Sequence, residues 1–151
     1  MPGSGTRTFL EPDHYEASLR QAQIEILIAL SPQFKARLTW AELHDLEVLR
    51  CEEDLTRVAY VCLSPQLSFV TFPAHSGPVP VWGGTELRPG EIVLHGRGER
   101  LHQSTPGSFV WNVIALANFG VSDSCELGLW RLTADKVAEI FGVEGCCPFS
   151  D

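Results

Sequence analysis

The sequence predicts a mainly β domain that is built as a sandwich or a closed barrel of short strands. Two observations support this prediction. Short apolar segments recur along the chain, and the segment around residues 34–40 alternates between apolar and polar side chains. Turns rich in glycine and proline separate these segments at regular intervals. This pattern favours a sandwich or barrel over a fold in which strands alternate with helices.

The first expected element is a short helix over residues 11–20. Pro12 suits the first turn of a helix, and acidic residues cluster at this end of the segment. Tyr15 and Leu19 lie four residues apart, so both side chains fall on one face of the helix. We expect this face to dock the helix on the body of the protein.

The strands follow in order along the chain. Predicted strands cover residues 23–30, 34–40, 46–51, 57–63, 67–72, 91–95 and 109–116, and Val81-Trp82 forms a short extended piece. Predicted turns lie at 52–54, 64–65, 83–84, 88–90, 96–98 and 105–107, where acidic residues, glycine or proline gather. In the strand 91–95, Ile92 and Leu94 are expected to face the barrel wall. A helix over 134–141 is predicted behind the capping residue Thr133.

Length and composition indicate one globular domain that needs no disulfide or metal for its core. The chain has 151 residues, of which 44% are hydrophobic and 20% charged. Its formal net charge of −8, from 11 basic and 19 acidic residues, argues against direct binding of a nucleic-acid backbone. The sequence shows no signal peptide and no membrane-spanning stretch, so we expect a cytoplasmic protein.

The cysteines fit a reducing compartment. There are five of them, an odd number, and they include the adjacent pair Cys146 and Cys147. We expect reduced thiols, because neighbouring side chains rarely point at one ligand and no Cys-x-x-Cys occurs. The sequence therefore predicts no cofactor.

Residues 83–107 carry the most specific pattern. A Pro-Gly-Glu turn at 89–91 leads into an apolar strand, a glycine turn at 96–98, then Glu99 and His102, which resembles a cupin half-motif. Further segments resemble the N-terminal cupin-like domain of AraC-type transcription regulators over roughly residues 6–117. These segments are 6–9, 13–15, 34–39, 43–46, 69–73, 81–84 and 87–90.

This resemblance implies a double-stranded β-helix of the jelly-roll type. It also implies a barrel that binds a small organic effector and supports a homodimer, with DNA read by a separate helix-turn-helix region. We expect one domain over 1–151, with the barrel and N-terminal helix in 6–117 and a C-terminal extension with one helix in 118–151. Residues 122–151 leave no room for paired helix-turn-helix units. The chain is then a sensing domain standing alone, or its DNA-binding half lies elsewhere or was lost.

The expected ligand site joins two tryptophans to the glycine turn. Trp40 and Trp111 are predicted to line the interior and stack on an effector, with core packing as the alternative for each. Trp82 is placed at the rim or at a dimer interface. We expect Arg97 and Arg100 either to bind the carboxylate of an anionic effector, or to be solvated or paired with Glu99 or Glu91. The predicted ligand-binding residues are Trp40, His95, Arg97, Glu99, His102 and Trp111.

Two other functions remain open. His95, Glu99 and His102 approach one another if the glycine turn brings them together, and two histidines with one carboxylate can hold non-haem iron in a small cupin enzyme. The His-x-His pair of metal-dependent cupins is absent from the sequence. Alternatively, the barrel is filled by its own side chains and the protein is a structural or interaction module. Glu42, His44 and Asp45 are assigned to a hairpin turn instead of a catalytic cluster.

Overall fold

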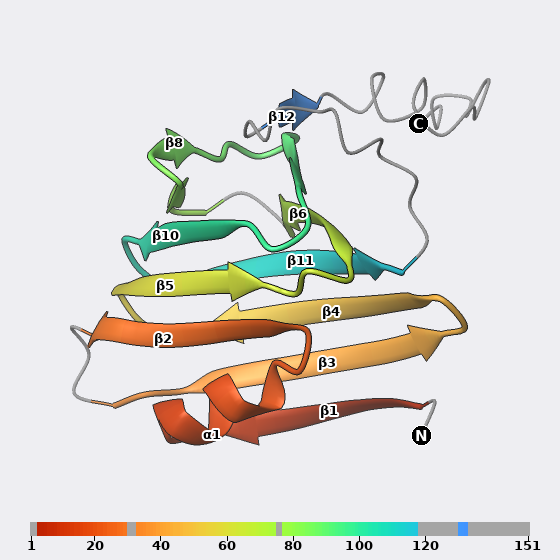
Figure 1. The fold of residues 1–151 in the computed structure, drawn as a ribbon. Coiled ribbons are helices and arrows are strands. Elements are labelled where there is room, and N and C mark those ends of the chain that lie inside the picture. Colours follow the sequence, from red (N-terminus) through yellow and green to blue (C-terminus); the bar gives the residue numbers. More distant parts are fainter. Residues whose placement is uncertain (1–2, 30–32, 75–76, 118–129, 133–151) are drawn as a thin grey trace, which may run out of the picture.

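The computed structural model describes residues 3–29, 33–74, 77–117 and 130–132, and shows a mainly β protein with two antiparallel sheets. The first sheet has the strand order β1-β3-β4-β11-β6-β9-β12, and the second has the order β2-β5-β10-β7-β8 (Figure 1). The first sheet contains β1 (Ser4–Phe9), β3 (Ala36–Leu43), β4 (Leu46–Glu53), β6 (Ser68–Pro73), β9 (Ile92–His95), β11 (Phe109–Leu116) and β12 (Trp130–Leu132). The second contains β2 (Ala22–Ala29), β5 (Arg57–Leu63), β7 (Val81–Trp82), β8 (Thr85–Glu86) and β10 (Arg100–Thr105).

The core lies between the two sheets because every second side chain of each strand points inward. In β5 the buried positions alternate with half-buried ones from Arg57 to Leu63, and β11 repeats this pattern from Phe109 onward. Each large apolar side chain buried there contributes about 1.5–3 kcal/mol relative to an exposed one. The predicted sandwich of short strands is confirmed.

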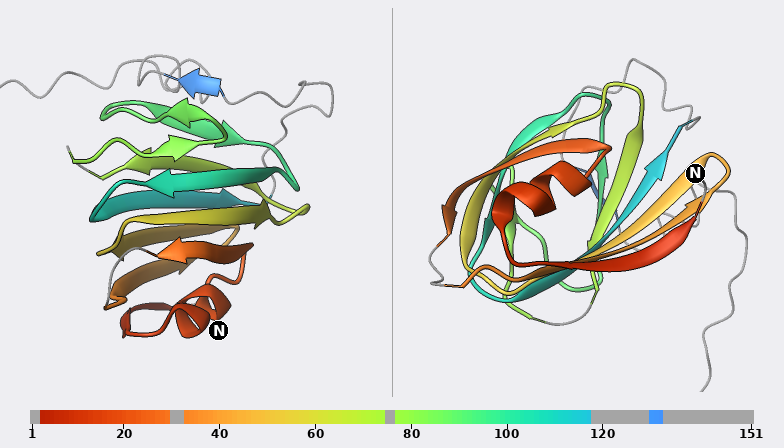
Figure 2. Two further views of the ribbon diagram at one scale, coloured as in Figure 1. Left: turned by 90° about the vertical axis from the view of Figure 1, so that its left-hand side faces the viewer. Right: turned by 90° about the horizontal axis from the view of Figure 1, so that it is seen from below.

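A single short helix, α1 (Pro12–Ser18), closes one end of the sandwich. The chain runs from β1 through α1 into β2, so the helix crosses from the edge of one sheet to the edge of the other (Figure 2). Tyr15 is fully buried, and its ring lies 5.6 Å from that of Phe9. The Glu16 carboxylate accepts a hydrogen bond of 2.8 Å from the Ile26 backbone N–H and ties α1 to β2. Pro12 in the first turn and the docking role of Tyr15 and Leu19 are confirmed.

Helix α1, with its seven residues, is too short to cross a membrane, and no other helix is found within the described ranges.

Most predicted strands are present, with some differences in detail. The bounds of β5 and β11 agree with the predicted ones. The acidic turn at 52–54 is wrong, because Glu52 and Glu53 belong to β4, where they pair with β3 and β11. The prediction that Ile92 and Leu94 are the inward side chains of the strand at 91–95 is also wrong, since Val93 and His95 are its buried side chains. The predicted helix over 134–141 lies outside the described residues.

The hairpin turn predicted around residues 42–45 is confirmed. Strands β3 and β4 pair up to Leu43 and Leu46, and His44 and Asp45 form the turn between them. His44 has a φ of 56°, in the left-handed region that an L residue adopts mainly in tight turns.

Candidate functional site

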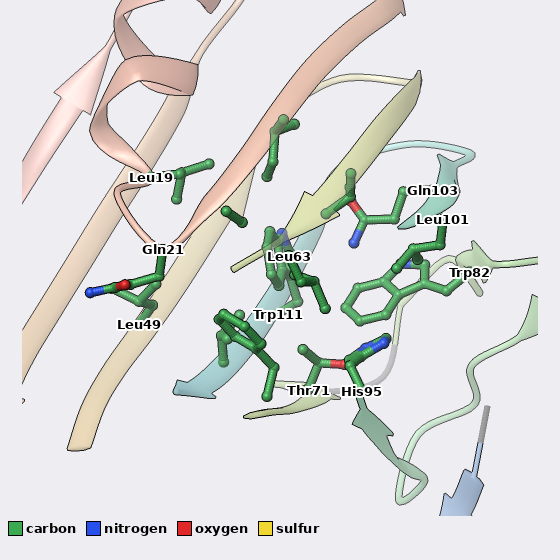
Figure 3. Close-up of a pocket in the computed structure, with 15 residues that line it drawn as sticks. Leu19, Gln21, Leu49, Leu63, Thr71, Trp82, His95, Leu101, Gln103 and Trp111 are labelled. Carbon is green, nitrogen blue, oxygen red and sulfur yellow. The ribbon is translucent and has the colours of Figure 1, made fainter. Parts of the chain in front are cut away.

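An interior cavity of about 40 Å³ lies between the two sheets (Figure 3). Its wall is largely apolar and draws on both sheets and on the chain between α1 and β2. The polar exceptions are Gln21, Thr71, His95 and Gln103. The apolar lining consists of Leu19, Ala22, Ile24, Leu49, Val61, Leu63, Phe69, Trp82, Leu101, Trp111 and Val113.

Two tryptophans meet at this cavity. The Trp82 and Trp111 rings pack edge to face, with centroids 5.5 Å apart and an interplanar angle of 88°, which is a favoured aromatic geometry. Trp82 is only 1% exposed, so its placement at the rim or at a dimer interface is wrong. The reason is its register. Trp82 of β7 pairs with Gln103 of β10, an inward-facing position, and its ring therefore enters the sandwich.

His95 projects into the cavity from β9. Its Nε2 lies 2.8 Å from the hydroxyl of Thr71, and its ring centroid is 5.7 Å from that of Trp82. The Nδ1 atom lies 3.3 Å from a Glu99 carboxylate oxygen, but the atoms are not aligned for a hydrogen bond. That same oxygen accepts the Gly96 backbone N–H at 3.0 Å.

Two buried nitrogens on residues that line the cavity have no hydrogen-bond partner among the described residues. They are His95 Nδ1 and Trp82 Nε1. Such groups are rare in native proteins, and each costs about 1–3 kcal/mol when left unsatisfied. The indole N–H of Trp82 would gain a partner from a polar group of a bound molecule, whereas His95 Nδ1 already lies beside Glu99.

A buried ion pair lies beside the cavity. The side chains of Glu53 and Arg57 are both 0% exposed, and Arg57 donates to Glu53 at 2.5 Å through Nε and at 3.0 Å through Nη2. Arg57 Nη2 also donates to the Gln103 side chain at 2.9 Å. Tyr15 donates its hydroxyl to Glu53 at 2.7 Å, and the indole N–H of Trp111 approaches the same oxygen at 3.4 Å.

The surroundings of Tyr15, Cys51 and Arg57 raise the pKa of all three groups. Burial raises the pKa of the Tyr15 hydroxyl and of the Cys51 thiol, and the nearby Glu53 carboxylate raises both further. Burial opposes the charge of Arg57, but attraction to Glu53 outweighs it and leaves the pKa of Arg57 raised. The pair thus neutralises itself, and it offers no free charge to a ligand in the cavity.

Sequence reasoning missed this ion pair because it assigned Glu53 to an exposed turn. The available signal was the spacing in residues 57–63. Arg57 has the same parity as Ala59, Val61 and Leu63, so a buried face for these three also buries Arg57.

The predicted ligand-binding residues do not all meet. Trp111 and His95 line the cavity, and Glu99 lies beside His95. Arg97 is exposed on the glycine turn, and Arg100, the other arginine flanking that turn, is also exposed. Trp40 lies in a separate cleft, described below.

His102 does not join His95 and Glu99. Leu101 and Gln103 point inward from β10, so His102 points outward, where its ring lies 5.3 Å from that of Tyr60. Within the described parts of the chain, no group of three His, Cys, Asp or Glu side chains is arranged to hold a metal ion. The predicted metal triad is therefore not assembled in this geometry.

A second, open cleft lies between α1 and the inner face of β1, β3 and β4. Its volume is about 510 Å³. Leu49 lines both this cleft and the interior cavity, so the two are adjacent. The other lining residues are Arg7, Phe9, His14, Ala17, Ser18, Arg20, Leu38, Trp40, Glu42 and Glu47.

Comparison with known proteins bears on the fold. No protein-family model and no curated protein matches the sequence. Among solved structures, an RmlC-like cupin from Shewanella frigidimarina NCIMB 400 matches with a TM-score of 0.42 and 13% identity, over 65% of this chain and 87% of that one. The AraC-like transcriptional activator CuxR matches with a TM-score of 0.56 and 15% identity, over 76% of this chain. The match spans 47%, about half, of the CuxR chain. The described β fold therefore resembles part of the AraC-like activator CuxR.

Proposed function

We propose that this domain senses a small organic molecule in the cavity between its sheets, as the ligand-binding half of an AraC-type regulator does, and that it binds without catalysis. The observation that carries the proposal is a largely apolar cavity in which Trp82 and Trp111 meet beside His95, and in which the indole N–H of Trp82 has no hydrogen-bond partner from the described part of the chain. A ligand that accepts from this N–H satisfies a polar group that the fold leaves unpaired.

The cavity limits the chemistry of that ligand. A volume of about 40 Å³ matches three or four water molecules, at roughly 10–15 Å³ each. A larger molecule has to displace Leu19 and Gln21 at the α1 end, since these side chains form that part of the wall. The lining favours an uncharged aromatic body that packs on Trp82 and Trp111, with one polar group directed at His95.

The test fills the cavity. Val113 lines it from β11, whereas its neighbour Ile114 points to the opposite face of the sheet, so Val113→Leu and Ile114→Leu form a matched pair. Phenol serves as the probe, because its hydroxyl can accept from Trp82 and meet His95. We expect phenol to raise the melting temperature of the wild type and of Ile114→Leu, and to leave Val113→Leu unchanged. An equal shift in both variants, or none in the wild type, would contradict the proposal.

Native mass spectrometry of the purified protein separates this function from its rivals. A bound organic molecule that is lost on denaturation supports sensing. A stoichiometric metal instead supports the metal-dependent enzyme, with His95 and Glu99 as its first candidates. A protein that carries no bound species and does not bind phenol supports a barrel that is filled by its own side chains and acts as an interaction module.

The proposal extends to assembly and location. We propose a cytoplasmic homodimer whose barrel follows the jelly-roll path of cupins, with DNA read by a region other than these sheets. Light scattering with and without phenol tests whether occupancy changes the dimer. Direct binding of DNA by this chain alone, measured at physiological salt, would count against this part.

A further inference from the structure

The open cleft beside α1 has the size of a ligand site. Its volume of about 510 Å³ falls within the range of roughly 300–1,000 Å³ that is typical of small-molecule pockets. Its lining comes from the inner face of the first sheet near the β1 edge and from α1, the helix at this end of the sandwich (Figure 2).

Trp40 forms the centre of the cleft floor. It is a half-buried side chain of β3, and it lies between Gly5 of β1 and Leu49 of β4 in the strand register. A Cβ atom at Gly5 would stand 2.6 Å from the Trp40 ring, so only glycine leaves the ring in this position. The floor is thus formed by an aromatic ring and by the apolar side chains of Leu38 and Leu49.

One end of the floor is acidic. Glu42 and Glu47 are direct cross-strand neighbours, and like charges at such positions repel. One carboxylate oxygen of Glu47 is buried without a hydrogen-bond partner. Burial, with Glu42 adding to it, raises the pKa of Glu47, although Gln21 and Arg20 act in the opposite direction. Two carboxylates therefore face one guanidinium at this end.

The other end is basic. Arg7 of β1 pairs in register with Leu38, on the far side of Trp40 from Glu42. The Arg7 guanidinium lies over the Phe9 ring, 5.1 Å from its centroid, and makes no ion pair within the described part of the chain. His14 of α1 also lines the cleft but lies 3.7 Å from Glu11, so among the described residues Arg7 is the free cation at this end, while Arg20 acts on Glu47 at the other.

We propose that this cleft is a second binding site, distinct from the interior cavity, for a small zwitterion with a hydrocarbon spacer. The ammonium group binds between Glu42 and Glu47, the spacer lies over Trp40, and the anionic group pairs with Arg7. Leu38, the register partner of Arg7, and Glu42 are four residues apart on β3, which is about 13 Å along the backbone. The ammonium and the anionic group of the ligand must therefore be separated by a spacer of several methylenes. The inference does not depend on whether the interior cavity binds anything.

The experiment is a titration with 6-aminohexanoate followed by ¹H–¹⁵N correlation spectra. Hexylamine and hexanoate, which each lack one of the two charged groups, serve as comparison probes. We expect 6-aminohexanoate to shift the indole N–H signal of Trp40, identified through Trp40→Phe, together with amides of β3 and β4. We expect both comparison probes to bind at least about fivefold more weakly, as loss of a partly exposed ion pair of about 1 kcal/mol implies.

Charge variants locate the two ends. Glu42→Gln and Arg7→Gln are each expected to weaken 6-aminohexanoate about fivefold. Arg100→Gln, an exposed site on β10 with the same charge change, is expected to leave the affinity unaltered. The proposal fails if 6-aminohexanoate causes no shifts at tens of millimolar, if its shifts centre on Trp82 and Trp111, or if hexylamine binds equally well.

Discussion

Replacing Arg57 by methionine should destabilise the fold strongly. The substitution keeps a long apolar side chain but removes the three hydrogen bonds to Glu53 and Gln103, at 2.5, 3.0 and 2.9 Å. It leaves a buried carboxylate without its cation, and breaking a buried pair in this way costs about 3–5 kcal/mol. With a urea dependence of about 2 kcal/mol per M, the unfolding midpoint should fall by roughly 2 M.

A neighbouring ion pair provides the control. Arg37 pairs with Glu52 on the outer face of the first sheet, where the two side chains are 52% and 22% exposed. Arg37→Met should lower the stability by less than about 1 kcal/mol, because water screens the exposed pair. Equal shifts of the urea midpoint in Arg57→Met and Arg37→Met would refute the reasoning.

A double variant guards against a chain that does not fold. Glu53→Gln removes the buried charge yet keeps an oxygen that can accept from Tyr15. Glu53→Gln/Arg57→Met should therefore be more stable than Arg57→Met alone, in the same urea titration. A double variant less stable than Arg57→Met would show that the unpaired carboxylate is not the source of the loss.

Three further predictions concern packing, pH and the accessibility of thiols. Gly5→Ala should lower the free energy of unfolding by about 1–3 kcal/mol, measured by thermal unfolding, because the added Cβ meets the Trp40 ring. Gly77→Ala should be neutral, since nothing lies within 4 Å of the added Cβ. Similar losses in both variants would contradict the steric argument. The raised pKa of Cys51 implies a stability contribution that is fully present below the ordinary thiol value of about 9 and is lost as the pH rises above it. Iodoacetamide, followed by peptide mass spectrometry, should label the half-buried Cys62 in the native protein and Cys51 only in urea; labelling of native Cys51 would contradict its burial.

The strands that the sequence predicts well are those with an apolar inner face. All inward side chains of β11 are apolar, as are those of β5 except Arg57, and the predicted and observed bounds of both strands agree. β10 was not predicted, because its inward positions include Gln103 and Thr105, which carry no hydrophobic signal. β1 was missed for a related reason: of its side chains only Phe9 is buried.

The site was harder to predict than the fold because it depends on pairing between distant segments. Nothing local to Trp40 or Trp82 tells which one enters the interior. Trp40 lies beside the edge strand through its partner Gly5, while Trp82 faces inward through its partner Gln103. A single strand sequence gives the alternation of its side chains, but the register with other strands decides which side chains meet.

The position of β11 has a consequence for how the chain folds. Phe109–Leu116 lies at the middle of the first sheet, between β4 (Leu46–Glu53) and β6 (Ser68–Pro73), although it follows all of their residues in the chain. Before β11 docks, the sheet exists as two halves, each with an unpaired edge. Such long-range pairing places folding on the slow side, in milliseconds to seconds. During synthesis the two edges stay unpaired until β11 has been made and docks between them. At this stage the chain is most exposed to pairing with another copy of itself.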